Sequence, residues 1–164
     1  MASGDIFSRW QAQDGLPPST AFAVLTRRNN HFVAGFDAAA IENLDFADVL
    51  DRKYSGGGLT LVLGWMSASA ITGDVVWNAQ IERHQDNIDD LDVDSLATAQ
   101  AATGTTASAT GELKYTTITF TNGANMDSLA IGEDFRLRIT RDATNASDTM
   151  AGDAQLKSIE LRET

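Results

Sequence analysis

The sequence predicts an all-β fold, an antiparallel β-sandwich of jelly-roll type with seven to eight main strands and an irregular N-terminal arm. Three observations support this prediction: short segments alternate apolar and polar residues, turn-forming residues separate them, and they follow one another at the spacing typical of sandwiches. The 164 residues suit one domain with a sizeable core. We therefore expect an arm over residues 1–19 and a single β-sandwich domain over residues 20–164.

The predicted strands follow from the alternation of apolar residues and from the turns between them. Residues 59–66 are apolar on both faces, which is typical of a central strand. Between residues 86 and 109 the alternation stops, and a short helix is predicted at 96–100. In chain order, strands are expected over residues 22–26, 31–36, 59–66, 74–83, 112–121, 135–141 and 154–162, and residues 38–46 form either a further strand or a short bridging segment.

The arm contains three large apolar side chains, Ile6, Phe7 and Trp10, before the proline pair Pro17–Pro18. The prolines favour an extended backbone. The apolar side chains either pack on their own domain or dock on a neighbouring subunit, and the sequence leaves both interpretations open.

Composition excludes several classes of function. The formal net charge is −11, with 12 basic residues against 23 acidic ones and no basic run, so we expect neither a nucleic-acid partner nor a membrane partner. There is no cysteine, which removes disulfides and thiolate chemistry. Neither a signal peptide nor an apolar run of membrane-spanning length is predicted.

Catalytic patterns are weak, and we predict that the chain is not an enzyme. The Gly-x-Ser-x-Gly nucleophile elbow is missing, and the two histidines, His31 and His84, read as surface residues at strand ends. Glycoside hydrolysis needs two positioned carboxylates. With 23 acidic residues, mostly in loops, no pair stands out.

Two acidic clusters raise the question of calcium, which prefers several oxygen ligands. The first cluster, within residues 86–94, lacks the glycine and the terminal glutamate of an EF-hand loop. The second cluster lies in one long loop, residues 142–153, which also contains Gly152. Solvated loops with Asx turns are the favoured interpretation, so no cofactor is expected, with a structural calcium in the second cluster as the alternative. The clusters are Asp86, Asp89, Asp90, Asp92 and Asp94, and then Asp142, Asn145, Asp148 and Asp153.

Exposed arginines form a small pattern on one predicted strand. Arg136 and Arg138 share a face, with Arg141 nearby. Cross-strand ion pairs explain the pattern, and an acidic partner subunit is the alternative. Trp65 and Trp77 fall on inward positions and are expected in the core rather than on a sugar-stacking platform.

Several segments resemble small virion structural proteins of tailed bacteriophages, over about residues 20–163. They are packing and turn motifs and carry no catalytic site with them. The segments are Gly56–Thr60, Trp65–Met66, Gly73–Trp77, Glu82–Arg83, Ile118–Thr121, Met126–Leu129, Phe135–Arg138, Arg141–Asp142 and Asp148–Ala154.

The resemblance implies a β-sandwich that assembles on a phage particle as a homotrimer, made in the host cytoplasm and located in the virion. The main expectation is a capsid decoration (cement) protein that binds the major capsid protein and stabilises the head between capsomers. The alternative is a tail-fibre or receptor-binding tip module that recognises a host-surface glycan. The contact residues predicted for assembly are Ile6, Phe7, Trp10, Arg136 and Arg138.

Overall fold

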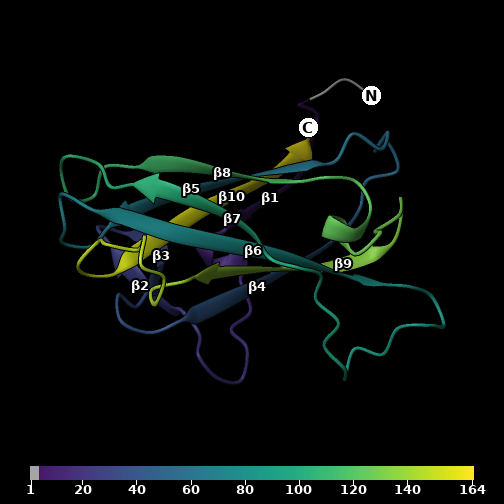
Figure 1. The fold of residues 1–164 in the computed structure, drawn as a ribbon, viewed down its shortest axis with the longest axis horizontal. Coiled ribbons are helices and arrows are strands. Elements are labelled where there is room, and N and C mark those ends of the chain that lie inside the picture. The colour runs from purple at the N-terminus through teal and green to yellow at the C-terminus, as the bar shows by residue number, and fades with distance from the viewer. Residues whose placement is uncertain (1–3) are drawn as a thin grey trace.

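The computed structural model describes residues 4–164, and these form ten strands and two short 3₁₀ helices (Figure 1). No helix in this range is long and apolar enough to cross a membrane. The elements are β1 Ile6–Gln11, η1 Ala12–Asp14, β2 Val24–Arg28, β3 His31–Phe36, β4 Glu42–Val49, β5 Leu59–Ser67, β6 Asp74–His84, β7 Gln100–Thr105, β8 Lys114–Phe120, η2 Ala124–Met126, β9 Asp134–Arg141 and β10 Ala154–Glu163.

Two antiparallel sheets face each other. Sheet A has the order β2-β3-β10-β5-β8, and sheet B has the order β4-β9-β6-β7. The eight strands β3 to β10 are distributed between the sheets as in a jelly roll. The predicted fold class is confirmed. β5 lies between β10 and β8, the central position that its two apolar faces predict.

The predicted irregular arm is corrected over residues 6–11, which form β1. β1 pairs with the Ser158–Arg162 part of β10, on the same edge where β3 pairs with Ala154–Leu156. This edge of β10 supplies partners for backbone groups that an irregular arm would leave to water. Residues 1–3 of the predicted arm lie outside the described part of the chain.

β7 is the second strand that the sequence does not predict. The helix expected at 96–100 does not form, because residues 96–99 are irregular and β7 begins at Gln100. The residues of β7 are small, and they pair with the edge of β6 from Asp74↔Thr105 to Ala79↔Gln100. Gly104 faces Trp65, where an added Cβ would lie 2.9 Å from Trp65 Cζ2. Small residues are therefore what lets β7 pack closely over the indole.

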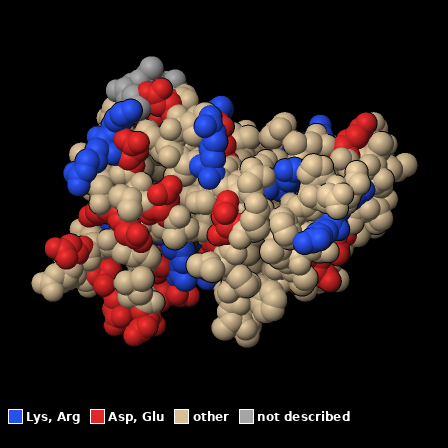
Figure 2. Space-filling view, turned by 180° about the vertical axis from the view of Figure 1, so that it is seen from behind, with Lys and Arg blue, Asp and Glu red and all other residues tan. Residues whose placement is uncertain are grey.

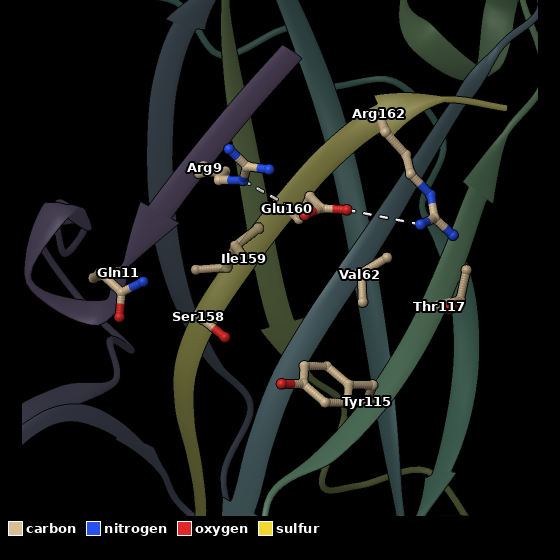
Figure 3. Close-up of a pocket in the computed structure, with 9 residues that line it drawn as sticks. All are labelled: Arg9, Gln11, Val62, Tyr115, Thr117, Ser158, Ile159, Glu160 and Arg162. Carbon is tan, nitrogen blue, oxygen red and sulfur yellow. Dashed lines mark ion pairs between the residues drawn. The ribbon is translucent and has the colours of Figure 1, made fainter. Parts of the chain in front are cut away.

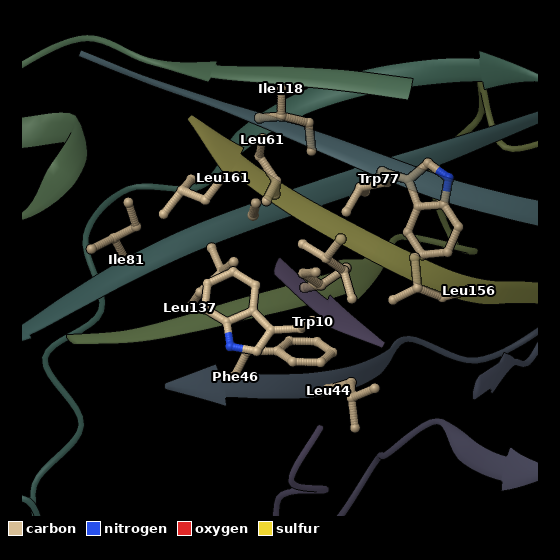
Figure 4. Close-up of a cluster of buried hydrophobic side chains, with 14 of the residues drawn as sticks. Trp10, Leu44, Phe46, Leu61, Trp77, Ile81, Ile118, Leu137, Leu156 and Leu161 are labelled. Atoms are coloured by element: carbon tan, nitrogen blue, oxygen red, sulfur yellow. The ribbon is translucent and has the colours of Figure 1, made fainter. Parts of the chain in front are cut away.

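The core lies between the sheets and consists of the side chains that the alternation predicts to point inward (Figure 4). Trp65 and Trp77 are both fully buried, with ring centroids 5.9 Å apart, and Phe36 packs edge-on against Trp77 at 5.1 Å. Burial of each large apolar side chain contributes about 1.5–3 kcal/mol. Neither tryptophan is available at the surface, as predicted.

Candidate functional site

The outer face of sheet A carries a hollow of about 430 Å³ (Figure 3). Four strands build it side by side, because β1 and β5 flank β10, and β8 flanks β5. We call this hollow and its rim the face-A hollow. Its lining residues are Arg9 and Gln11 of β1, Val62 of β5, Tyr115 and Thr117 of β8, and Ser158, Ile159, Glu160 and Arg162 of β10.

Tyr115 provides an exposed aromatic ring at this hollow. Because Thr116, Ile118 and Phe120 of β8 point into the core, Tyr115 points outward, and it is 66% exposed. Its cross-strand neighbour on β5 is Gly64. A Cβ on Gly64 would lie 3.2 Å from Tyr115 Cε1 and would collide with Ser158 Oγ. The glycine therefore keeps the floor open beside the ring.

The rim of the face-A hollow is polar. Glu160 lies between two arginines, with Arg9 Nε 3.6 Å and Arg162 Nη1 3.7 Å from its carboxylate oxygens. Lys157 Nζ donates to Gln11 Oε1 at 3.2 Å. Donors and acceptors thus stand around an aromatic ring on one open surface, an arrangement suited to a ligand with both hydroxyl groups and apolar faces.

A second hollow, of about 360 Å³, lies on the same face toward β3, and we refer to the face-A hollow and this one together as the two face-A hollows. Met66 and Val33 form part of its floor, and Lys157 and His31 are on its lining. Arg28 also lines it, where its Nη1 donates to Ser67 O at 2.9 Å and Gln155 Oε1 at 2.7 Å. His31 therefore lies on the lining of this second hollow.

The outer face of sheet B confirms the predicted cross-strand ion pairs. Arg138 holds Asp45 through two hydrogen bonds of 2.8 Å, and this bonding raises the pKa of Arg138. Arg136 Nη2 lies 2.5 Å from Glu82 and 2.7 Å from Asp94, and the hydrogen bond lowers the pKa of Asp94. Both arginines are engaged within the chain.

His84 belongs to this charged face as well. Its Nδ1 lies 2.9 Å from Asp134 Oδ1, and its Nε2 lies 3.5 Å from Glu82 Oε2. Both partners are carboxylates, and they hold the imidazole at the outer face of sheet B.

The apolar residues predicted as contacts in the arm belong largely to the chain's own core. Trp10 is buried against Phe46, with centroids 5.7 Å apart, and its Nε1 donates to Ala47 O at 3.3 Å. Phe7 packs edge-on against Tyr54, and Ile6 is 38% exposed. Packing on their own domain, one of the two interpretations left open, describes Phe7 and Trp10, since β1 is bound into sheet A.

The loop of residues 142–153 does not fit a calcium ion. Asp148, its central carboxylate, receives Arg141 Nη2 at 2.8 Å and Nε at 3.1 Å, and also the Val76 amide at 3.0 Å. Asp142 accepts from Thr144 and Asn145 in local turns. Across residues 4–164, no three His, Asp or Glu side chains are grouped to hold a metal. The predicted ligand set, including Asp153, is thus not assembled.

We expect calcium to leave the stability of the protein unchanged. The carboxylate that would anchor the ion is already neutralised by Arg141, so a cation would have to displace a buried guanidinium. Thermal melts in calcium and in a chelator should coincide. A melting temperature that falls on chelation and is restored by calcium would contradict this account of the loop.

Comparison with known proteins finds similar folds among solved structures and no match by sequence. No family model matches the sequence, and no curated protein matches it. A structure of the carbohydrate-binding module CBM36 in complex with calcium and xylotriose superposes with a TM-score of 0.51 and 14% identity, covering 94% of this chain and 99% of that one.

Two further structures match more weakly. TmCBM61 in complex with β-1,4-galactotriose has a TM-score of 0.45 and 10% identity, covering 98% of this chain and 92% of its own. A family 35 carbohydrate-binding module from Clostridium thermocellum has a TM-score of 0.45 and 12% identity, covering 94% and 95%. At these identities the likeness shows the β-sandwich fold alone, and it is the CBM36 match that carries it.

These findings correct the main functional expectation. The CBM36 structure, the match with a TM-score above 0.5 described above, is a carbohydrate-binding module, so the prediction of a capsid decoration protein is wrong. The surfaces foreseen for capsomer contact are also committed internally, because Trp10 packs in the core and Arg136 and Arg138 hold carboxylates of the same chain. The homotrimer and the virion location rest only on the sequence resemblance and stay predictions.

Proposed function

We propose that this chain is a non-catalytic carbohydrate-binding module whose glycan lies across the outer face of sheet A. The observation that carries the proposal is Tyr115, an exposed ring beside the open floor left by Gly64. A sugar presents C–H faces that pack on an aromatic ring and hydroxyl groups that need hydrogen-bond partners. Gln11, Thr117 and Ser158 line the same hollow and supply such partners.

The shape of the hollow supports a glycan over a small buried ligand. Its volume of about 430 Å³ falls within the usual range for ligand sites, yet its lining comes from the outer face of four adjacent strands. A chain of sugars can extend along such a face with several residues in contact. Because the rim groups are partly exposed, binding does not require burial of an unpaired charge.

The fold and the sequence resemblance bear on the architecture of the proposed module and on where it would act. The β-sandwich is the architecture shared with the CBM36 structure, although a fold alone does not determine a function. The resemblance to virion proteins of tailed bacteriophages left a tail-fibre or receptor-binding tip as its alternative, and we propose that setting for the module. The glycan would then be part of the host surface.

A glycan array followed by calorimetry tests the proposal. We expect the wild type to bind at least one glycan, and Tyr115→Ala to weaken that binding roughly thirtyfold, the effect of removing an aromatic anchor. Tyr115 is 66% exposed, so the variant should fold normally, which circular dichroism would verify.

Phe32→Ala is the matched control, since Phe32 is an exposed aromatic residue of β3 that lines neither face-A hollow. Its binding should equal that of the wild type. Loss of binding in Phe32→Ala but not in Tyr115→Ala would place the ligand elsewhere. A wild type that binds no glycan on the array would overturn the proposed function.

A further inference from the structure

The charges that line the outer face of sheet A have the opposite sign to the protein as a whole. The chain has a net charge of −11. The residues lining the two face-A hollows nevertheless include four cations, Arg9, Arg28, Lys157 and Arg162, against one carboxylate, Glu160. Figure 2, which views the molecule from behind Figure 1, shows basic side chains spread over this side, with acidic ones between them and a larger acidic group at the lower left.

The cations at the Tyr115 end of this face are only loosely paired. Within residues 4–164, the ion pairs of Arg9 and Arg162 are both with Glu160, at 3.6 and 3.7 Å, and thus beyond hydrogen-bond distance. One carboxylate cannot neutralise two guanidinium groups. The side chain of Arg9 is 68% exposed and that of Arg162 is 40% exposed, so the N–H donors of both face solvent.

The arginines of sheet B show the contrast. Arg138 forms a bidentate ion pair with Asp45, and Arg141 forms a bidentate ion pair with Asp148. Arg136 contacts Glu82. The chain therefore pairs each of those arginines with its own carboxylates. On the outer face of sheet A it leaves guanidinium donors available, although it has 23 acidic residues in total.

We propose that the glycan bound by this face is acidic, with its carboxylate or sulfate groups held by Arg9 and Arg162. This inference rests on the proposed glycan-binding function. The planar guanidinium matches either anion with paired hydrogen bonds. In Figure 3, Arg9 and Arg162 stand on either side of Glu160, and Tyr115 lies further along the same face. One sugar can therefore stack on the ring while the charged group of another reaches an arginine.

The field of the protein adds to the selectivity. An anionic glycan is repelled by the acidic remainder of the surface and attracted to this one face, which orients its approach. Neutral glycans gain nothing from the field. Binding of the acidic ligand should therefore weaken as salt is added, because exposed charges are screened.

Two matched pairs of probes test the inference by calorimetry: oligogalacturonate with its methyl ester, and dextran sulfate with dextran. In each pair the backbone is the same and only the charge differs. We expect binding to at least one charged member to exceed that to its neutral partner about tenfold or more at low salt. The pair that responds identifies carboxylate or sulfate as the recognised group.

The variant Arg9→Gln/Arg162→Gln should reduce this preference about tenfold or more. The control Arg52→Gln/Lys53→Gln makes the same change in net charge at two exposed residues that line neither face-A hollow, and it should keep the preference. Equal loss in both variants would mean that overall charge, not these arginines, is responsible, and would overturn the inference.

The failures of the two proposals are distinguishable. Tyr115-dependent binding that is equal for charged and neutral members, or is confined to neutral glycans on the array, would overturn the acidic ligand and leave glycan binding intact. A wild type that binds neither these probes nor any arrayed glycan would overturn both proposals.

Discussion

Replacing Arg141 with methionine is expected to lower the free energy of unfolding by about 3–5 kcal/mol, because it breaks a buried ion pair from one side. Arg141 is fully buried, and Asp148, its partner, is almost as inaccessible. The same guanidinium donates to the carbonyl oxygens of Gly152 at 2.8 Å and Met150 at 2.9 Å. Arg141→Met leaves the carboxylate and these carbonyls without their donor.

Urea denaturation of Arg141→Met and of a matched control, Arg9→Met, measures this effect. Arg9 also pairs with a carboxylate, that of Glu160, but its side chain is 68% exposed and the two atoms lie 3.6 Å apart, so we expect the control to cost about 1 kcal/mol or less. If the two variants lost the same free energy, the buried pair would not be what fixes the 142–153 loop.

Replacing Trp77 with alanine is expected to cost about 3–5 kcal/mol, through lost burial and the cavity that remains. Trp77 is fully buried between Phe36 and Trp65. Trp77 belongs to β6 in sheet B, whereas Phe36 and Trp65 belong to strands of sheet A. The indole therefore joins the two sheets, and its removal weakens the contact between them.

Substitution by phenylalanine separates the indole N–H from the ring. Trp65 Nε1 donates to Thr116 Oγ1 at 2.8 Å, whereas Trp77 Nε1 has no partner among the described residues. Trp65→Phe should therefore cost about 1 kcal/mol more than Trp77→Phe in the same denaturation experiment. The reverse order would show that the hydrogen bond to Thr116 does not stabilise the core.

Alternation predicts the core but not every strand. In β5, β6 and β9 the inward side chains are large and regularly spaced, so the burial of these side chains can be predicted from the sequence. β7 reads as Gln-Ala-Ala-Thr-Gly-Thr, with no large apolar residue. It is a strand because the edge of β6 pairs with it. Such a strand depends on partners far along the chain and is not apparent from its own residues.

The same limitation applies to Arg141 and to the candidate site. Arg141 follows Phe135, Leu137 and Ile139 on the inward face of β9, yet its charge suggests an exposed position until the 142–153 loop supplies its partners. Tyr115 falls on the outward face by alternation, and Gly64 interrupts an apolar strand. Those two signals point to the site, but its polar rim comes from β1 and β10, whose positions beside β5 only the fold reveals.

A titration of ¹⁵N-labelled protein with the strongest glycan from the array, followed by NMR, tests the central claim most directly. The account predicts that the largest amide shifts fall on β5, β8 and β10 around the face-A hollow, at Gly64, Tyr115 and Ser158. Shifts confined to the loops that join the two sheets, or to β2, would show that the glycan binds elsewhere and would contradict the account.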